Sequence, residues 1–273
     1  MKVCTFFVFI FLTACTQTSL STKTMINGVE LDYQVRGSGP PLYLLHGGLE
    51  SRDSFENQIP SFAEHFTVVA LDSRKQGRSG NGPPGLPISY ELMSADVIGL
   101  ARHLGHPRIS IVGLSDGGIT AITAAIEHPE FVDRLVLLGA TYHYSAYPDT
   151  VREFITNYEW DGNTDPTRYP GNFIKHYLTG REDLTEFAEL LDEMATMWTT
   201  SPTFKKSDLE QIEARTLVIN GDREDVPLEH TFELYNSLPD AQLFVVPNAT
   251  HYALEEHPEL LNDVILQFLL SSK

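Results

Sequence analysis

Short apolar runs alternate with longer stretches of helical periodicity along most of the chain. Two runs near the start, 24–26 and 29–35, flank Asn27-Gly28, a dipeptide typical of tight β-hairpin turns. The later runs alternate with helical patterns, which predicts a mostly parallel sheet of eight strands with helices on both faces. After the hairpin, the predicted strands are 42–45, 67–71, 109–112, 135–138, 216–219 and 243–246, and the predicted helices are 53–63, 90–104, 117–127, 228–237 and 258–270.

The alternation breaks between residues 141 and 212. This segment is rich in aromatic residues and lies between two predicted strands. Because an insertion at this point can cover a site at the carboxyl ends of the strands, we expect 141–212 to form a helical cap. The core that carries the sheet would then comprise 25–140 and 213–273.

The first residues have the pattern of a secretory signal. Met1-Lys2 is followed by an apolar stretch, 6–12, which is too short to span a bilayer stably. Leu12-Thr13-Ala14-Cys15 resembles the bacterial lipobox, which implies that 1–14 is removed and that Cys15 carries a lipid. The alternative is an ordinary signal peptide with a chance cysteine.

The resemblance to the lipobox implies that the protein is a lipoprotein of the bacterial cell envelope. Residues 15–24 would form a polar tether, and membrane contact would be through the lipid on Cys15 alone. Thr16 replaces the aspartate associated with inner-membrane retention, which favours the outer membrane, facing the periplasm.

Composition narrows the range of functions. The 273 residues are 42% hydrophobic, which argues against disorder, and they carry a formal net charge of −18. Because such a charge repels phosphates, nucleic acid is not expected as a partner. Of the two cysteines, Cys4 lies in the segment to be removed, so no disulfide is expected in the mature domain.

The main chemical signal is the G-x-S-x-G pattern at residues 113–117. It follows a predicted strand and precedes a predicted helix, which is the setting of a nucleophile elbow that exposes a serine hydroxyl. Ser115 is therefore the candidate nucleophile. The alternative is a glycine-rich turn with an incidental serine.

Partners for Ser115 can be expected after the last two strands. His251 follows strand 243–246, and its ordinary pKa near neutrality suits a general base. Asp222, Glu224 and Asp225 follow strand 216–219, and one carboxylate could hold the imidazole in the correct tautomer. The chain order of serine, acid and histidine is that of the α/β-hydrolase fold, not of chymotrypsin or subtilisin.

From about residue 25 to its end, the chain resembles the α/β-hydrolase fold superfamily. This resemblance implies an α/β fold with a mostly parallel eight-stranded sheet and an inserted helical cap, and a mechanism that needs no cofactor and no metal. The matching motifs are Leu44-Leu45-His46-Gly47-Gly48, Asp72-Ser73-Arg74, Gly77-Arg78-Ser79, the elbow, Gly221-Asp222-Arg223-Glu224 and 247–251.

The resemblance also implies roles for single residues. Ser115 would be the nucleophile and His251 the general base. The oxyanion hole would be formed by the backbone N–H of Asp116 and that of Gly48 or Leu49. His46 is usually structural in this motif.

The acid departs from the family pattern. The family generally has aspartate where this chain has Glu224, and Asp225 comes immediately after it. Either the longer glutamate side chain reaches the histidine, or the loop is shifted by one residue and Asp225 serves. We favour Glu224, because Ser-His-Glu triads are compatible with this fold. Asp222 is the third choice.

Within the superfamily, residues 115–120 are similar to the valacyclovir-hydrolase-like esterases, which prefer α-amino-acid esters. The resemblance implies that Asp116 faces the ammonium group of the substrate. The alternative is an outward-facing acid that is stabilised by the helix dipole.

These observations predict a serine hydrolase that cleaves a small carboxylic ester through an acyl-enzyme on Ser115. A perhydrolase of the haloperoxidase type or a carbon–carbon bond hydrolase could use the same triad. An alternative of another class is a non-catalytic ligand-binding module of the envelope.

Overall fold

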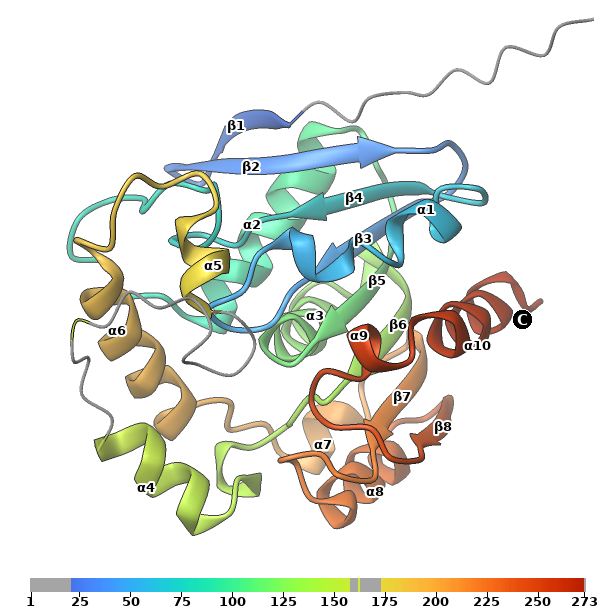
Figure 1. Cartoon of the computed structure of the whole chain (residues 1–273). Helices are drawn as coiled ribbons and strands as arrows, with labels where there is room; N and C mark the ends of the chain where they lie inside the picture. Colours follow the sequence, from blue (N-terminus) through green and yellow to red (C-terminus); the bar gives the residue numbers. More distant parts are fainter. Residues whose placement is uncertain (1–20, 158–161, 163–172, 273) are drawn as a thin grey trace, which may run out of the picture.

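An eight-stranded sheet runs through the centre of the computed structural model, which describes residues 21–157, 162 and 173–272 (Figure 1). The order of the strands is β1-β2-β4-β3-β5-β6-β7-β8. β1 and β2 pair antiparallel, as do β2 and β4, and all other pairs are parallel, which confirms the predicted fold class. The strands are β1 Thr22–Ile26, β2 Val29–Arg36, β3 Pro41–Leu45, β4 Thr67–Leu71, β5 Ile109–Leu114, β6 Val132–Leu138, β7 Arg215–Gly221 and β8 Ala241–Val246.

The hairpin between β1 and β2 turns at Asn27 and Gly28. Both residues have positive φ, 47° and 78°, as a two-residue turn of the primed type requires. Ile26 then pairs with Val29, so the predicted turn sets the register of the first two strands.

Helices cover both faces of the sheet (Figure 1). Side chains of a strand alternate between the faces, so in β3 Tyr43 and Leu45 join one apolar cluster, and Leu42 and Leu44 join the other. The first cluster is covered by α2 Tyr90–His103, α3 Asp116–Glu127 and α8 Leu228–Ser237, and the second by α1 Ile59–Phe62, α9 Ala253–Glu256 and α10 Pro258–Leu270.

The predicted helix 53–63 is wrong as one continuous element. A 3₁₀ turn, η1 Arg52–Phe55, is followed by the short helix α1 Ile59–Phe62. Pro60 explains the break, because it has no N–H and its ring would collide with the carbonyl of Glu56 in a continuous helix. Proline is tolerated in the first turn, where α1 begins.

Helices occupy the segment between β6 and β7, which we call the cap (141–212). Leu190, Met194 and Met197 of α6 pack with Leu49 and Ile119 of the sheet-bearing part. α6 therefore lies against the loop that follows β3 and against the first turns of α3. The elements of the cap are η3 Tyr144–Ala146, α4 Asp149–Asn157, α5 Phe173–Leu178, α6 Phe187–Thr200 and α7 Lys206–Leu209, and a further 3₁₀ turn, η2 Pro129–Phe131, precedes β6.

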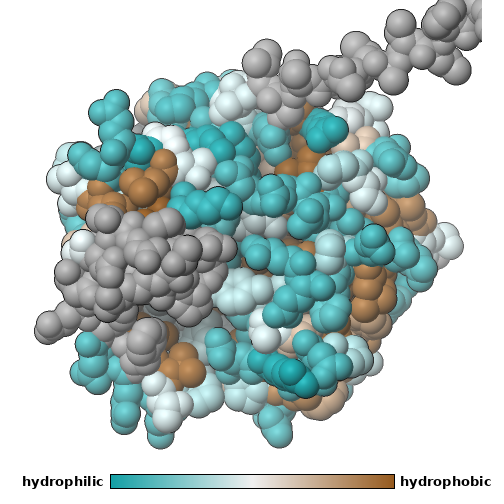
Figure 2. Space-filling view, in the orientation of Figure 1, coloured by the Kyte–Doolittle hydropathy of each residue, from teal (hydrophilic) through white to brown (hydrophobic). Residues whose placement is uncertain are grey.

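The predicted signal peptide 1–14, the lipid site Cys15 and tether residues 16–20 lie outside the described residues. Among the residues that are described, no helix has the length and apolar character needed to cross a membrane. The face shown in Figure 2 is largely hydrophilic, with apolar side chains in small patches.

Candidate active site

Ser115 lies in a strained backbone conformation between β5 and α3. Its φ is 52° and its ψ is −117°, and its amide donates to the carbonyl of Leu138 at 2.8 Å. A Cβ on Gly113 would collide with the carbonyl oxygen of Gly117, and one on Gly117 would collide with that of Leu45. The glycines of the motif are thus required by close backbone approach, and Ser115 is held where an elbow places a nucleophile.

His251 and Glu224 form a close pair on the loops after β8 and β7. His251 Nδ1 lies 2.5 Å from Glu224 Oε1, and the Glu224 side chain is 3% exposed. The pair packs on Gly139, where a Cβ would lie 3.0 Å from Glu224 Oε2 and 3.1 Å from His251 Nδ1. Because a carboxylate only accepts, Nδ1 donates, and Nε2 is left to take a proton.

The structure places Glu224, and not Asp225 or Asp222, against the imidazole. Asp225 is exposed, and its amide donates to Glu224 Oε1 at 2.9 Å. Asp222 is also exposed, and its amide donates to the carbonyl of Val246 at 3.1 Å. The loop is therefore not shifted by one residue, and the longer side chain of Glu224 reaches the ring.

The charges around His251 favour its protonated form. Burial alone would lower the pKa of His251, but the charge and hydrogen bond of Glu224, with the charges of Glu50 and Asp225, raise it to about 9. In the ligand-free protein the basic form of the ring therefore increases as the pH rises towards 9. Among the described residues, no hydrogen bond joins the Ser115 hydroxyl to the ring, a contact that often tightens only when substrate binds.

Of the two amides expected from the loop after β3, that of Leu49 is already engaged. Its N–H donates to Gln76 Oε1 at 2.6 Å, and its φ is 60°. Within the described part of the chain, no acceptor is recorded for the amide of Gly48 or for that of Asp116, the first residue of α3. Gly48 and Asp116 are thus the amides open to a ligand oxygen.

His46 has a structural place, as the motif implies. Its Nε2 accepts from the amide of Ser73 at 2.9 Å, so Nδ1 carries the proton and donates to the carbonyl of Gly47 at 2.7 Å. Burial lowers the pKa of His46 despite the charge of Asp72, which keeps the ring neutral.

Asp116 is buried rather than outward-facing, which excludes the solvated alternative. Tyr90 donates its hydroxyl to Oδ1 at 2.8 Å, and Trp198 of α6 donates its Nε1–H to Oδ2 at 2.8 Å. Burial raises the pKa of Asp116 against these two bonds and the charge of His251. No basic side chain pairs with Asp116 among the residues that the structure describes.

Several residues of the site carry no local signal in the sequence. Tyr90 and Trp198 reach Asp116 from helices far away in the chain, and nothing in their surroundings marks them as site residues. Tyr147 is a third aromatic residue at the site. Burial raises the pKa of its hydroxyl, and the charges of Asp116 and Glu224, which act on that hydroxyl, raise it further. The aromatic richness of the cap is the only indication in the sequence that some of its rings line the site.

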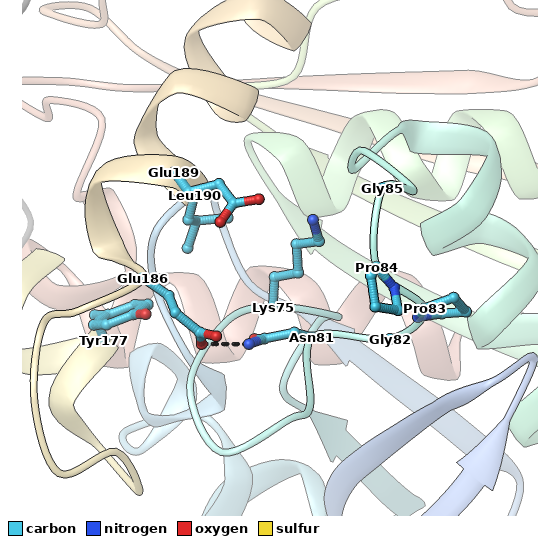
Figure 3. A pocket seen from close by; sticks show the side chains of 10 residues that line it. All are labelled: Lys75, Asn81, Gly82, Pro83, Pro84, Gly85, Tyr177, Glu186, Glu189 and Leu190. Atoms are coloured by element: carbon cyan, nitrogen blue, oxygen red, sulfur yellow. Dashed lines mark hydrogen bonds between the residues drawn. The ribbon is translucent and has the colours of Figure 1, made fainter.

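A pocket of about 330 Å³ lies at the seam between the cap and the loop 75–85, away from Ser115 (Figure 3). Asn81 donates to Glu186 across it, and Lys75 at its wall forms an ion pair of 2.6 Å with Glu193. None of the predicted site residues lines this pocket. Its walls are the loop 75–85 and the cap, so it lies where the cap packs against the rest of the protein.

Comparisons with known proteins agree with this architecture. The profile of the α/β hydrolase fold family matches residues 40–188. The chain is 26% identical, over 89% of its length and 88% of the relative, to a 2-hydroxy-6-oxo-6-(2'-aminophenyl)hexa-2,4-dienoic acid hydrolase from Metapseudomonas resinovorans. It is 25% identical to serine hydrolase BPHL from Homo sapiens, over 85% of this chain and 80% of that protein. A solved meta-cleavage product hydrolase from Pseudomonas fluorescens IP01 superposes with a TM-score of 0.78 at 22% identity, covering 91% of this chain and 97% of that one.

Replacing Gly48 by alanine tests the contact of α6 with the loop after β3. The added methyl would collide with Asp116 Oδ2 and would lie 2.5 Å from Trp198 Cζ2 and 2.7 Å from Met194 Cε. We expect Gly48→Ala to lower the free energy of unfolding in urea by about 1 to 3 kcal/mol, as overpacking does. Gly80→Ala is the matched control, because its Cβ would meet nothing closer than 3.5 Å. Equal stability of the two variants would contradict the packing described here.

Proposed function

The chain belongs to the α/β-hydrolase fold family and is a hydrolase, and within this family we propose that it cleaves small carboxylic esters through an acyl-enzyme on Ser115. The observation that carries the proposal is the pairing of His251 with Glu224 at the same edge of the sheet as the elbow. Glu224 follows β7, His251 follows β8 and the strained Ser115 follows β5. This is the arrangement of a Ser-His-acid triad.

In the acylation step, Ser115 Oγ attacks the carbonyl carbon of the ester, and His251 Nε2 takes the hydroxyl proton. Glu224 accepts from Nδ1–H and stabilises the imidazolium that forms. The amides of Gly48 and Asp116 donate to the oxyanion of the tetrahedral intermediate, and each donor contributes about 3 kcal/mol. The intermediate then collapses, the ester C–O bond breaks, and His251 returns the proton to the leaving alcohol.

In the deacylation step, a water molecule attacks the acyl-enzyme and gives one proton to His251. The same two amides stabilise the second tetrahedral intermediate. When this intermediate collapses, the carboxylic acid is released and the proton returns to Ser115 Oγ. Every proton is thus moved by His251, and no cofactor takes part in this sequence.

Asp116 favours esters that carry an α-amino group. Its carboxylate is buried next to Ser115 and accepts hydrogen bonds from Tyr90 and Trp198, and in the part of the chain that the structure describes no lysine or arginine pairs with it. A substrate ammonium would supply the missing positive charge in a poorly hydrated place, where such attraction is strong. We therefore propose α-amino-acid esters as the preferred class.

A carbon–carbon bond hydrolase is the second candidate, because one full-length relative is by its name a hydrolase of a dienoic acid. The same Ser115 and His251 could serve it. The buried carboxylate of Asp116 weighs against a substrate that is itself an anion, since two like charges would meet without water. A perhydrolase would also use this triad, whereas a non-catalytic binding module would not need the pair of His251 and Glu224.

The proposed triad is tested by hydrolysis of p-nitrophenyl acetate by the full chain. We expect Ser115→Ala to lower kcat/KM by about a thousandfold or more and Glu224→Gln by about a hundredfold or more, because the imidazolium loses its acceptor. Asp225→Asn is the matched control and should stay within about threefold. A larger loss in Asp225→Asn than in Glu224→Gln would reject the assignment of the acid.

The role of Asp116 is tested with two substrates that differ only in the α-amino group, the p-nitrophenyl esters of L-alanine and propionic acid. Asp116→Asn keeps an acceptor for Tyr90 or Trp198 but removes the charge. We expect kcat/KM for the alanine ester to fall by roughly tenfold or more, while the value for the propionate ester changes by less than about threefold. An equal loss on both esters would mean that Asp116 supports the fold of the site and does not read the ammonium.

A further inference from the structure

Glu50 is a buried acid that the proposed mechanism does not use. It is 4% exposed, and its Oε2 accepts from the Ser54 hydroxyl at 2.7 Å and from the Gly47 amide at 3.3 Å. The contact with Gly47 is close, since a Cβ there would lie 3.1 Å from Glu50 Oε1. Among the described residues, no lysine or arginine pairs with this carboxylate.

The fold brings Glu50 next to the loop of His251. Glu50 lies two residues before η1, and His251 lies two residues before α9. η1 packs against α9, and Gln58 Nε2 donates to the carbonyl of Leu254 at 3.1 Å, which fixes the two segments together. The charges of Glu50 and His251 consequently act on one another.

We propose that Glu50 is a second positioning acid of the active site. Through the amide of Gly47 it holds the loop that presents the Gly48 amide, and its negative charge joins that of Glu224 in stabilising the protonated ring of His251. This inference rests on the proposed function of His251 as a general base, but it concerns a different group with its own consequences.

The groups that face the ring come from four segments. Glu224 and Asp225 follow β7, Glu50 follows β3, Asp116 begins α3, and Tyr252 packs edge-on against the ring with centroids 5.8 Å apart. Each of these four carboxyl groups, when it is ionised, stabilises the protonated form of the His251 ring. Glu50 differs from Glu224 because it bonds the backbone of the loop and does not bond the ring.

Glu50 itself titrates in the neutral range. Burial raises its pKa to about 7, although the Ser54 hydroxyl, the charge of His251 and the Gly47 amide oppose the shift, and Glu255 of α9 adds a further negative charge. Above this pH Glu50 is an anion, so it is charged in the range where His251 loses its proton, about pH 9. Removing the charge of Glu50 must therefore lower the pKa of His251.

The sign of the effect on activity follows from the role of His251. A base works only when it is unprotonated, so a lower pKa of His251 moves the acid limb of kcat/KM to lower pH. The imidazolium of the transition state is then less stabilised, so the rate on the plateau falls. A loss of packing alone would lower the rate without moving the limb.

Glu50→Gln in the full chain tests the proposal, because glutamine keeps an oxygen for Ser54 and removes the charge. We expect the pKa of the His251 ring, followed by NMR titration, to fall by about one unit, with the acid limb of p-nitrophenyl acetate hydrolysis moving by the same amount. The plateau should fall by roughly tenfold. Glu56→Gln is the matched control on an exposed acid near η1 and should behave as wild type.

An unchanged pKa of His251 in folded Glu50→Gln would overturn the proposal, even if the rate falls. The NMR titration does not depend on catalysis, so it tests the link between Glu50 and His251 by itself. A wild-type protein that does not hydrolyse esters would count against the proposed function and would leave this link intact. If Glu50→Gln does not fold, Ser54→Ala removes the hydroxyl that stabilises the anion of Glu50. This variant should raise the pKa of Glu50, so the step in the chemical shifts of the His251 ring that follows the ionisation of Glu50, near pH 7 in the wild type, should move to higher pH. A step that is absent or does not move would reject the inference.

Discussion

The close approach of the backbones of β3, β5 and α3 is the constraint on which the site depends. Gly113 and Gly117 have no room for a side chain, and the chain between them must turn within a few residues. Ser115 is therefore held at a positive φ of 52° that a non-glycine residue seldom adopts. The strain is localised at a serine that follows the carboxyl end of β5, and the carbonyl of Leu138 accepts from its amide.

Around this serine, the chain places buried carboxylates with different partners. Glu224 bonds the imidazole, Asp116 receives Tyr90 and Trp198, and Glu50 receives Ser54 and the loop amide. These environments suit the three acids to the different roles that we propose for them, which are to stabilise the base, to present a charge to the substrate and to support the loop that carries the Gly48 amide. Together they favour positive charge inside the site, which suits both an imidazolium intermediate and a cationic substrate.

The sequence predicted what depends on local pattern. Alternating apolar runs located all eight strands, and helices 228–237 and 258–270 have the predicted bounds. The break in the predicted helix 53–63 has a local cause in Pro60, which the apolar pattern alone does not show. The family resemblance favoured Glu224 over Asp225, but only the packing of both loops on Gly139 shows which acid meets His251. The bonds of Trp198 to Asp116 and of Gln76 to Leu49 join distant segments, and no local pattern encodes such contacts.

The central claim is that Ser115 is a nucleophile activated by His251. Its most direct measurement is the reaction of the full chain with a fluorophosphonate probe, followed by intact mass and peptide mapping. We predict one adduct per chain, on Ser115, and its loss in a folded His251→Ala variant. A protein that stays unlabelled, or that is labelled on another residue while Ser115 remains free, would contradict the account.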